Sequence, residues 1–289
     1  MNIGDIVVRR SYDKDISFKI IDIKENNNKR TYLLKGINVR IIADSNEEDL
    51  ERVEENYLGE QDKILNRKVS KVVNKAIGAR NTSLKRNIAE IEKKNIKYDD
   101  KYFGRPGKIL HIDGDVEYLE TCLKVYKQLS LDVVGMAIAE RKQHKVIVDL
   151  VKDIKPDIVV LTGHDGVIKN SKDYLDVNCY RNSKYYIEAV RALRNYIPSY
   201  DELVIFAGAC QSCYEGMLDA GANFASSPSR VLIHCLDPVF ICEKIAYTKI
   251  DEVVSIKDVI DNTITGNRGI GGLQTRGKYR EGYPKSYYI

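Results

Sequence analysis

The sequence predicts an α/β protein whose main domain is a largely parallel sheet covered by helices on both faces. After Gly107, β-rich runs and amphipathic helical segments alternate with few interruptions, which is typical of this fold class. The first 45 residues are instead short β-rich runs separated by turn residues, which predicts a separate small β-domain. With 289 residues and 43% hydrophobic residues, the chain has room for about two domains, and no apolar run approaches the roughly 18 residues of a membrane span.

Residues 1–55 are predicted to form a small SH3-like β-barrel. The β-rich runs are Ile6–Val8, Phe18–Ile23, Thr31–Leu34 and Val39–Ile42. Residues 25–29, with three asparagines, are typical of a hairpin turn. Small barrels of this kind usually bind a partner or pack on a neighbouring domain, and nothing in this segment suggests chemistry. The same N-terminus lacks an apolar signal segment, so we expect a cytoplasmic protein with free thiols.

Residues 56–105 are predicted to be a basic helical linker. Apolar residues recur here at three- and four-residue intervals, while Gly78 and the run Asn81–Ser83 predict a break between two helices. Bases outnumber acids in this stretch, which indicates either a surface for an anionic polymer or a solvated helical face. We favour the solvated face and do not expect nucleic acid as a partner. As an exposed connector the linker would be protease-sensitive, with Arg80, Arg86 and Arg105 as candidate points of self-cleavage.

Residues 106–289 carry the alternating pattern. The predicted strands are Lys108–Ile112, Leu131–Ala139, Asp157–Leu161, Leu203–Phe206 and Val231–Leu236, and the predicted helices are Val116–Leu129, Lys145–Ile154, Tyr185–Tyr196 and a helical region from Pro238 onward. In such sheets ligands collect at the carboxyl ends of the strands. Five reactive side chains fall at or near those ends: His111, Asp113, His164, Cys210 and Asp237. The sequence therefore predicts one reactive edge.

Two of these strand ends carry the parts of a cysteine nucleophile. One strand ends in Thr-Gly-His-Asp-Gly at residues 162–166, and the next ends in Ala-Gly-Ala-Cys-Gln-Ser at residues 207–212. A free thiol, with a pKa near about 8.5, needs a base to become the attacking thiolate. A single crossover separates the two strands, so His164 is the candidate base for Cys210. Gly163 and Gly166 leave room for substrate beside the imidazole.

Other interpretations of these motifs remain open at this stage. Cys210 and Cys213 form a CxxC motif, which suggests a thiol oxidoreductase or, with His234, Cys235 or Cys242, a zinc site. The spacing matches no compact zinc ribbon, and we expect neither a metal nor a cofactor. A third alternative is a binding or scaffold protein with a degenerate catalytic core. The glycine-rich residues 266–272 lack a preceding strand, so they are predicted to be a loop beside the reactive edge rather than a dinucleotide site.

A strand followed by His and Gly and a second strand followed by Ala-Cys is similar to the caspase-like cysteine peptidases, although this chain has His-Asp-Gly where many of them have His-Gly. Together with the N-terminal β-domain and the stretch Ser226–Phe240, these motifs resemble the YabG peptidases of endospore-forming bacteria over nearly the whole chain. The resemblance implies a caspase-like three-layer core with a mainly parallel sheet. It also implies a sporulation-specific cysteine endopeptidase, in the mother-cell cytoplasm and at the forming coat, that cleaves spore coat and cortex-associated proteins.

The resemblance further implies roles for individual residues. Cys210 would be the nucleophile, and His164 the general base and acid, with protonation of the leaving amine as its main task. Backbone N–H groups of Cys210 and of the turn from Gly163 to Gly166 would hold the oxyanion. Cleavage after arginine would require a carboxylate for the guanidinium. Asp113 is the first candidate for that acid, Asp115 the second and Asp237 the third.

Overall fold

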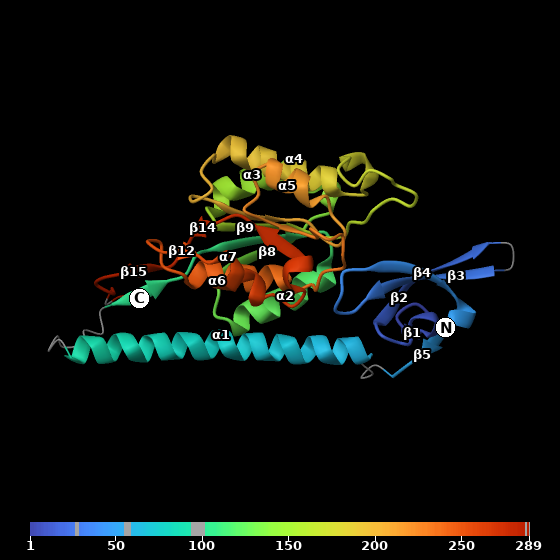
Figure 1. Ribbon diagram of the computed structural model, residues 1–289, viewed down its shortest axis with the longest axis horizontal. Coiled ribbons are helices and arrows are strands. Elements are labelled where there is room, and N and C mark those ends of the chain that lie inside the picture. Colours follow the sequence, from blue (N-terminus) through green and yellow to red (C-terminus); the bar gives the residue numbers. More distant parts are fainter. Residues whose placement is uncertain (27–28, 55–58, 94–101, 287, 289) are drawn as a thin grey trace.

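The N-terminal domain is an antiparallel sheet. The computed structural model describes residues 1–26, 29–54, 59–93, 102–286 and 288 (Figure 1). The sheet has the order β4-β3-β2-β1-β5 and contains β1 (Ile6–Arg9), β2 (Ser17–Asn26), β3 (Lys29–Gly36), β4 (Ile42–Asn46) and β5 (Leu50–Arg52). Its core is formed by Val7, Phe18, Ile20, Tyr32, Leu34 and Leu50. The β-rich character predicted for this segment is thus confirmed, and β5 lies beyond the last of the predicted β-rich runs.

One helix, α1 (Glu60–Lys93), follows where two were predicted. The backbone is helical through both Gly78 and residues 81–83, so the predicted break is wrong. A glycine costs only about 1 kcal/mol in a helix, and packing of an apolar face outweighs a cost of that size. That face includes Leu65, Val69, Val72, Val73, Ala76 and Ile77 and packs on the core.

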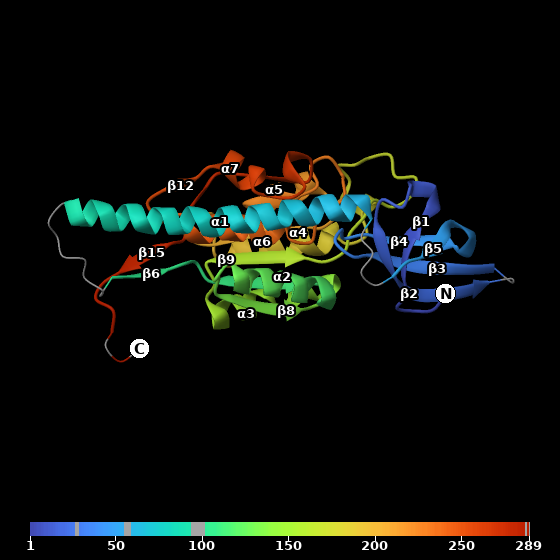
Figure 2. The same ribbon diagram turned by 90° about the horizontal axis from the view of Figure 1, so that it is seen from below.

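The helix α1 extends along the length of the parallel-sheet domain (Figures 1 and 2). The first half of α1, up to Arg80, is therefore a packed part of the fold rather than an exposed connector. Arg80 donates a hydrogen bond to the Leu129 carbonyl at 2.7 Å. The side chain of Arg86, another candidate point of self-cleavage, lies outside the described residues.

The main domain is built on a six-stranded sheet with the order β13-β11-β10-β9-β7-β8. Its strands are β7 (Ile109–Asp113), β8 (Val133–Ala137), β9 (Ile158–Thr162), β10 (Val204–Ala207), β11 (Phe224–Ser226) and β13 (Ile270–Gly272). All neighbouring pairs are parallel except β11 and β13. Every residue of β7, β9 and β10 is buried, as expected for strands covered on both faces.

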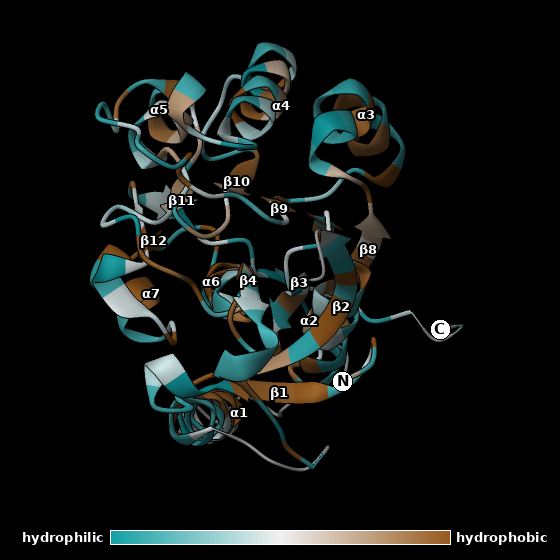
Figure 3. Ribbon diagram, turned by 90° about the vertical axis from the view of Figure 1, so that its right-hand side faces the viewer, coloured by the Kyte–Doolittle hydropathy of each residue, from teal (hydrophilic) through white to brown (hydrophobic). Residues whose placement is uncertain are grey.

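Helices form a layer on each side of this sheet (Figure 3). One layer contains α3 (Glu140–Ile154), α4 (Ser183–Tyr196) and α5 (Tyr214–Asp219), and the other contains α2 (Val116–Gln128), α6 (Asp237–Tyr247) and α7 (Ile256–Asp261), with α1 outside it. Each layer encloses its own apolar cluster against the sheet. The mixed α/β fold with a mainly parallel sheet, as predicted, is confirmed.

The predicted strand Val231–Leu236 is wrong. Within it only His234 makes a β-type contact, an isolated antiparallel bridge to Val39 of the N-terminal domain. The sheet position next to β10, on the side away from β9, belongs instead to β11. The glycine-rich residues 266–272, predicted to be a loop, contain a 3-10 turn and the edge strand β13.

Two short strand pairs tie the ends of the main domain together. The strand β6 (Phe103–Arg105), at the end of the predicted linker, pairs with β15 (Arg280–Gly282), and β12 (Val253–Val254) pairs with β14 (Thr275–Arg276). Among the described helices, none combines the length and the apolarity needed to cross a bilayer.

The N-terminal sheet lies at the carboxyl ends of the parallel strands. In Figure 2 the arrow of β9 points toward it. Lys35 at the end of β3 contacts Asp115, and Arg40 in the loop between β3 and β4 contacts Asp113. The small domain therefore packs against the edge where the sequence predicted the reactive groups.

Candidate active site

Two neighbouring strands deliver His164 and Cys210 to the same edge of the sheet. In the register of β9 and β10, Leu161 lies opposite Ala207. One residue further along, the Thr162 hydroxyl donates a hydrogen bond to the Gly208 carbonyl at 2.9 Å. The two turns are therefore joined at their start by this bond. His164 lies two positions after Thr162, and Cys210 lies two positions after Gly208.

Three contacts fix the position of His164. Its Nε2 lies 2.8 Å from Oδ2 of Asp115, its backbone N–H donates to the Glu140 carboxylate at 2.7 Å, and its carbonyl accepts a hydrogen bond from Asn182 at 2.8 Å. The side chain is 24% exposed. The imidazole is thus oriented by an acid, an arrangement that also occurs in catalytic sites where a carboxylate holds a histidine.

Asp115 was the second candidate for binding arginine, but its contacts are with His164, the N-terminal domain and its own helix. It accepts a hydrogen bond from Lys35 at 2.6 Å and caps α2 by accepting the N–H groups of Glu117 and Tyr118. Burial opposes ionisation, but hydrogen bonds from His164 and Lys35 outweigh it and hold the pKa of Asp115 well below its ordinary value. A permanently ionised carboxylate therefore faces the imidazole.

Cys210 is almost fully buried, with 2% of its surface exposed. The Ile233 N–H donates to its sulfur at 3.1 Å. Burial raises the pKa of the Cys210 thiol to about 12, although the Ile233 N–H acts in the opposite direction. Both side chains lie in the described part of the chain, and no hydrogen bond joins Cys210 to His164. A thiol with a pKa this high is neutral at pH 7.

A buried carboxylate braces the two turns against each other. Asp165 accepts the Gly166 N–H at 2.8 Å and the hydroxyl groups of Ser183 at 2.5 Å and Ser212 at 2.8 Å. Ser212 in turn accepts the N–H of Ala209, beside the thiol, at 2.9 Å. Burial raises the pKa of Asp165. The side chain of Asp165 thus has a structural role.

The glycines of the first turn differ in what they offer to a substrate. Gly163 has φ +156, and an added Cβ would collide with the Glu140 carboxylate. The N–H of Gly166 is already donated to Asp165. Within the part of the chain that the structure describes, the backbone N–H groups of Cys210 and Asp165 donate no hydrogen bond, so both are free donors at this edge.

Asp113, the first candidate for binding arginine, holds a guanidinium in this structure. Arg40 forms a two-pronged ion pair with it, at 3.0 Å from Nη1 to Oδ1 and 2.6 Å from Nη2 to Oδ2. Both side chains are fully buried, and Nη1 also donates to the Gly163 carbonyl at 3.4 Å. Burial alone would raise the pKa of Asp113, but the Arg40 charge holds it well below its ordinary value.

Asp237, the third candidate, makes different contacts. It accepts the N–H groups of Ile264 at 2.6 Å and His234 at 3.1 Å, and it also bonds the Thr265 hydroxyl. None of its hydrogen bonds reaches Arg40 or Asp113. Burial raises its pKa, so it is a poor partner for a second cation.

Four residues at this edge were not predicted: Lys35, Arg40, Tyr118 and Glu140. Lys35 and Arg40 come from the β-domain, which carried no chemical motif, and Tyr118 and Glu140 lie near the first turns of α2 and α3. An acid at a helix start is a common and unspecific pattern. No local signal could therefore have assigned these residues to the site.

All six cysteines are free thiols, including the Cys210 and Cys213 pair. The Cys213 N–H donates a hydrogen bond to the Ser183 hydroxyl at 2.8 Å. Among the described residues, no group of three His, Cys, Asp or Glu side chains has an arrangement that could hold a metal ion. The proposed zinc partners His234, Cys235 and Cys242 are buried in the fold.

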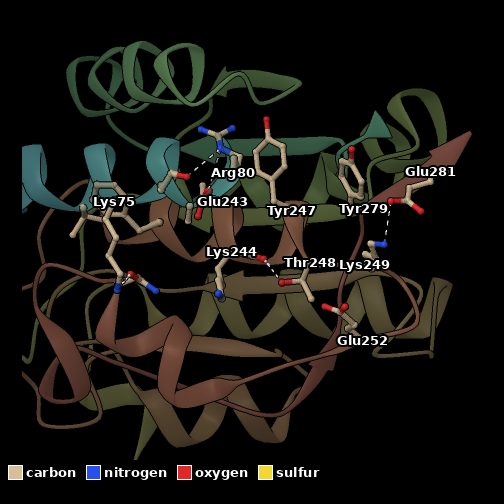
Figure 4. A pocket seen from close by; sticks show the side chains of 15 residues that line it. Lys75, Arg80, Glu243, Lys244, Tyr247, Thr248, Lys249, Glu252, Tyr279 and Glu281 are labelled. Carbon is tan, nitrogen blue, oxygen red and sulfur yellow. Dashed lines mark hydrogen bonds and ion pairs between the residues drawn. The ribbon is translucent and has the colours of Figure 1, made fainter. Parts of the chain in front are cut away.

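A groove of about 460 Å³ lies elsewhere, between α1, α6 and the C-terminal strands (Figure 4). Arg80, Glu243 and Tyr247 line it, together with Lys249 and Glu281, which form an ion pair at 3.1 Å. None of the predicted site residues borders this groove.

The chain is similar to known proteins over nearly its whole length. Residues 2–284 match the family model described as YabG peptidase U57. The chain is also 41% identical over 284 residues to the sporulation-specific protease YabG of Bacillus subtilis (strain 168), covering 98% of this chain and 97% of that protein. No solved structure matches.

Proposed function

The chain belongs to the YabG peptidase family, and on that premise we propose that it is a cysteine endopeptidase that cleaves proteins after arginine during sporulation. The observation that carries this proposal is the arrangement at one sheet edge of a thiol, an acid-oriented imidazole and a buried carboxylate that binds a guanidinium. Cys210 is the nucleophile, His164 the proton carrier and Asp113 the acid that selects arginine.

The catalytic cycle follows from the hydrogen bonds around His164. Because Nε2 faces Asp115 at 2.8 Å, Nδ1 is the nitrogen that exchanges protons with the reacting groups. The sulfur of Cys210 attacks the scissile carbonyl carbon, and the new C–S bond forms as the thiol proton leaves for His164. The C–N bond then breaks while the imidazolium protonates the leaving amine. Water attacks the resulting thioester and releases the acid product.

The tetrahedral intermediates need donors for their oxyanion. The free N–H groups of Cys210 and Asp165 supply them, and a donor of this kind is worth roughly 3 to 4 kcal/mol in the transition state. The N–H of Gly166 is already donated to the Asp165 side chain, so this glycine shapes the turn, whereas the N–H of Gly163 is a further candidate donor. Asp165 is held by hydrogen bonds to Ser183 and Ser212, which keeps this donor in a fixed place.

Arginine selectivity follows from the fork at Asp113. A carboxylate that receives two parallel N–H groups matches a planar guanidinium, whereas a lysine ammonium offers a single point charge. The Arg40 side chain supports this, because its guanidinium forms two hydrogen bonds of 3.0 Å or less to the Asp113 carboxylate. A substrate arginine would take the same place.

The broader setting of this activity is also part of the proposal. The core would have the caspase-like arrangement, with an SH3-like domain over residues 1–55, a helical segment over 56–105 and the peptidase domain over 106–289. The substrates would be coat and cortex-associated spore proteins, cleaved in the mother-cell cytoplasm and at the forming coat. Support comes from the family and from the name of the relative, a sporulation-specific protease.

The test is cleavage of a fluorogenic peptide with a single arginine before the reporter, comparing the purified protein with its variants. Cys210→Ala and His164→Ala are expected to abolish cleavage. Cys213→Ala is the matched control, because it removes a neighbouring buried thiol and is expected to retain activity. Cleavage that survives Cys210→Ala would contradict the assignment, and a requirement for both thiols would point to thiol redox chemistry instead.

A further inference from the structure

The loop between β3 and β4 of the N-terminal domain, residues 37–41, occupies the edge where a substrate would bind. Resting on the function proposed above, we propose that this loop is an intramolecular pseudosubstrate, with Arg40 in the arginine pocket. The folded chain is then a self-inhibited form, and a substrate must displace the loop to reach Cys210. Three independent sets of contacts support this inference.

The loop backbone pairs with the chain beside the nucleophile as an added strand would. Val39 and His234 form an antiparallel bridge, the Arg40 N–H donates to the Ile233 carbonyl at 3.3 Å, and the Cys235 N–H donates to the Asn38 carbonyl at 3.1 Å. Addition of an extended peptide to an exposed edge is a common mode of peptide recognition. Ile233 also donates its N–H to the Cys210 sulfur at 3.1 Å, so the loop is aligned on the nucleophile.

The Arg40 side chain is buried as a bound ligand would be. It is a hairpin-loop arginine, yet only 1% of its surface is exposed, and its partners Asp113 and Gly163 both belong to the main domain. Its Nε has no hydrogen-bond partner in the described part of the chain. A buried donor without a partner weakens the binding of Arg40 in the pocket. Weaker binding makes it easier for a substrate to displace the loop.

Contacts around the loop fasten it to the catalytic groups. The Tyr118 hydroxyl lies 2.5 Å from the Gly36 carbonyl and 2.9 Å from that of Val39. At the start of the loop, Lys35 contacts Asp115, the acid that orients the imidazole. Displacing the loop therefore also changes the surroundings of His164.

The geometry after Arg40 distinguishes an inhibitor from a substrate. The Ile41 N–H donates to the Val39 carbonyl at 2.8 Å, and the Gly36 N–H donates to the Ile41 carbonyl at 2.9 Å. The chain turns back directly after Arg40. The Ile41 nitrogen, which would be the leaving group in cleavage after Arg40, is therefore held inside the turn. The loop is thus bound by its first half and kept from cleavage by its second. Because it is tethered, its effective concentration is of the order of mM, and it competes with substrates below that level.

The first experiment measures how fast a peptidyl-arginyl chloromethyl ketone alkylates the enzyme at Cys210, and how the fluorogenic peptide is cleaved. Arg40→Gln is expected to raise the alkylation rate and kcat/KM at least tenfold, mainly through a lower KM. Arg52→Gln, a surface arginine of the same domain that is 67% exposed in its side chain, is the matched control and is expected to behave as wild type. Unchanged rates in a folded Arg40→Gln protein would overturn the inference.

The second experiment uses only the wild-type protein and does not depend on the folding of a variant. Hydrogen exchange is compared before and after Cys210 is alkylated with the same ketone. Expulsion of the loop is expected to increase exchange in a peptide that covers residues 37–41. Protection that persists after alkylation, or cleavage between Arg40 and Ile41 seen by mass spectrometry, would contradict a pseudosubstrate.

The two experiments separate failure of this inference from failure of the proposed function. If the peptide is cleaved in a Cys210-dependent way but Arg40→Gln changes nothing, the enzyme assignment stands and the inhibitory loop does not. If neither the wild type nor Arg40→Gln shows Cys210-dependent cleavage or alkylation, the proposed function itself is wrong.

Discussion

The buried ion pair between Arg40 and Asp113 links the two domains, and its contribution to stability can be measured with a double-mutant cycle. Both side chains are fully buried, and two charge-assisted hydrogen bonds of 3.0 and 2.6 Å join them. Asp113→Asn leaves the guanidinium with one weakened partner and the Gly163 carbonyl at 3.4 Å. Removal of one member of a buried pair typically costs about 3 to 5 kcal/mol.

Arg40→Gln is expected to cost a similar amount, because it leaves a buried carboxylate without its cation. If the two losses were independent, the double variant would lose roughly 6 to 10 kcal/mol. Two neutral amides at these positions can instead bond each other, so the double variant is expected to lose about as much as either single one. The coupling free energy should therefore be about 3 to 5 kcal/mol, at or above the upper end of values for contacting residues.

The assay is urea unfolding at pH 7, followed by far-UV circular dichroism and by tyrosine fluorescence. The chain has 19 tyrosines and no tryptophan, so the second probe is distributed over both domains. Coincident transitions justify a two-state free energy of unfolding. Because the pKa of Asp113 is lowered in the fold, the contribution is present above the ordinary aspartate pKa and lost as the pH falls below it. Losses that add to within about 0.5 kcal/mol would refute a coupled pair.

Three further outcomes are expected. Burial lowers the pKa of His234 to about 3, so its contribution to the free energy of unfolding is complete above the unfolded pKa of about 6.5 and falls by on the order of 4 kcal/mol toward pH 3. His234→Asn should therefore make the urea midpoint depend less on pH across that range. An unchanged pH dependence of the midpoint would count against this. Asp115→Asn should lower kcat roughly 10- to 100-fold and shift the pH–rate profile, because it removes the charge that orients His164; an unaltered profile would argue against that role. Gly163→Ala, at φ +156 and against the Glu140 carboxylate, should lower the thermal unfolding midpoint by the equivalent of about 1 to 3 kcal/mol, whereas a wild-type midpoint would show that the turn can relax.

The reactive edge could be predicted from the sequence because a parallel sheet brings strand ends together. Asp113, His164 and Cys210 each follow a run of apolar residues, and the fully buried strands β7, β9 and β10 are adjacent in the sheet. The side chain that fills the proposed pocket could not be found this way. Arg40 lies 73 positions from Asp113 in a domain without chemical motifs, and only the packing of the two domains brings them together.

The wrong predictions have a common physical origin in contacts that local patterns do not contain. Gly78 was expected to end a helix, but the apolar face of α1 packs on the core and the helix continues. The apolar run Val231–Leu236 satisfied every local criterion for a strand. Instead, the Ile233 carbonyl accepts the N–H of Arg40 and the Cys235 N–H donates to the Asn38 carbonyl. The segment therefore pairs with the other domain at the sheet edge.

The proposed arginine selectivity and the proposed inhibition by the loop make separable demands on the Asp113 carboxylate. A competing loop lowers the apparent affinity of every substrate by the same factor, namely the fraction of molecules in which the pocket is free. Arg40→Gln should therefore raise kcat/KM equally for two peptides that differ only in arginine or lysine before the scissile bond. Asp113→Asn should instead change the ratio between them, because it removes the fork that a guanidinium matches and an ammonium does not. Both variants are measured side by side with the two peptides. An altered ratio of kcat/KM between the arginine and lysine peptides in Arg40→Gln would mean that this arginine shapes the pocket wall. An unaltered ratio in Asp113→Asn would mean that another acid sets the selectivity.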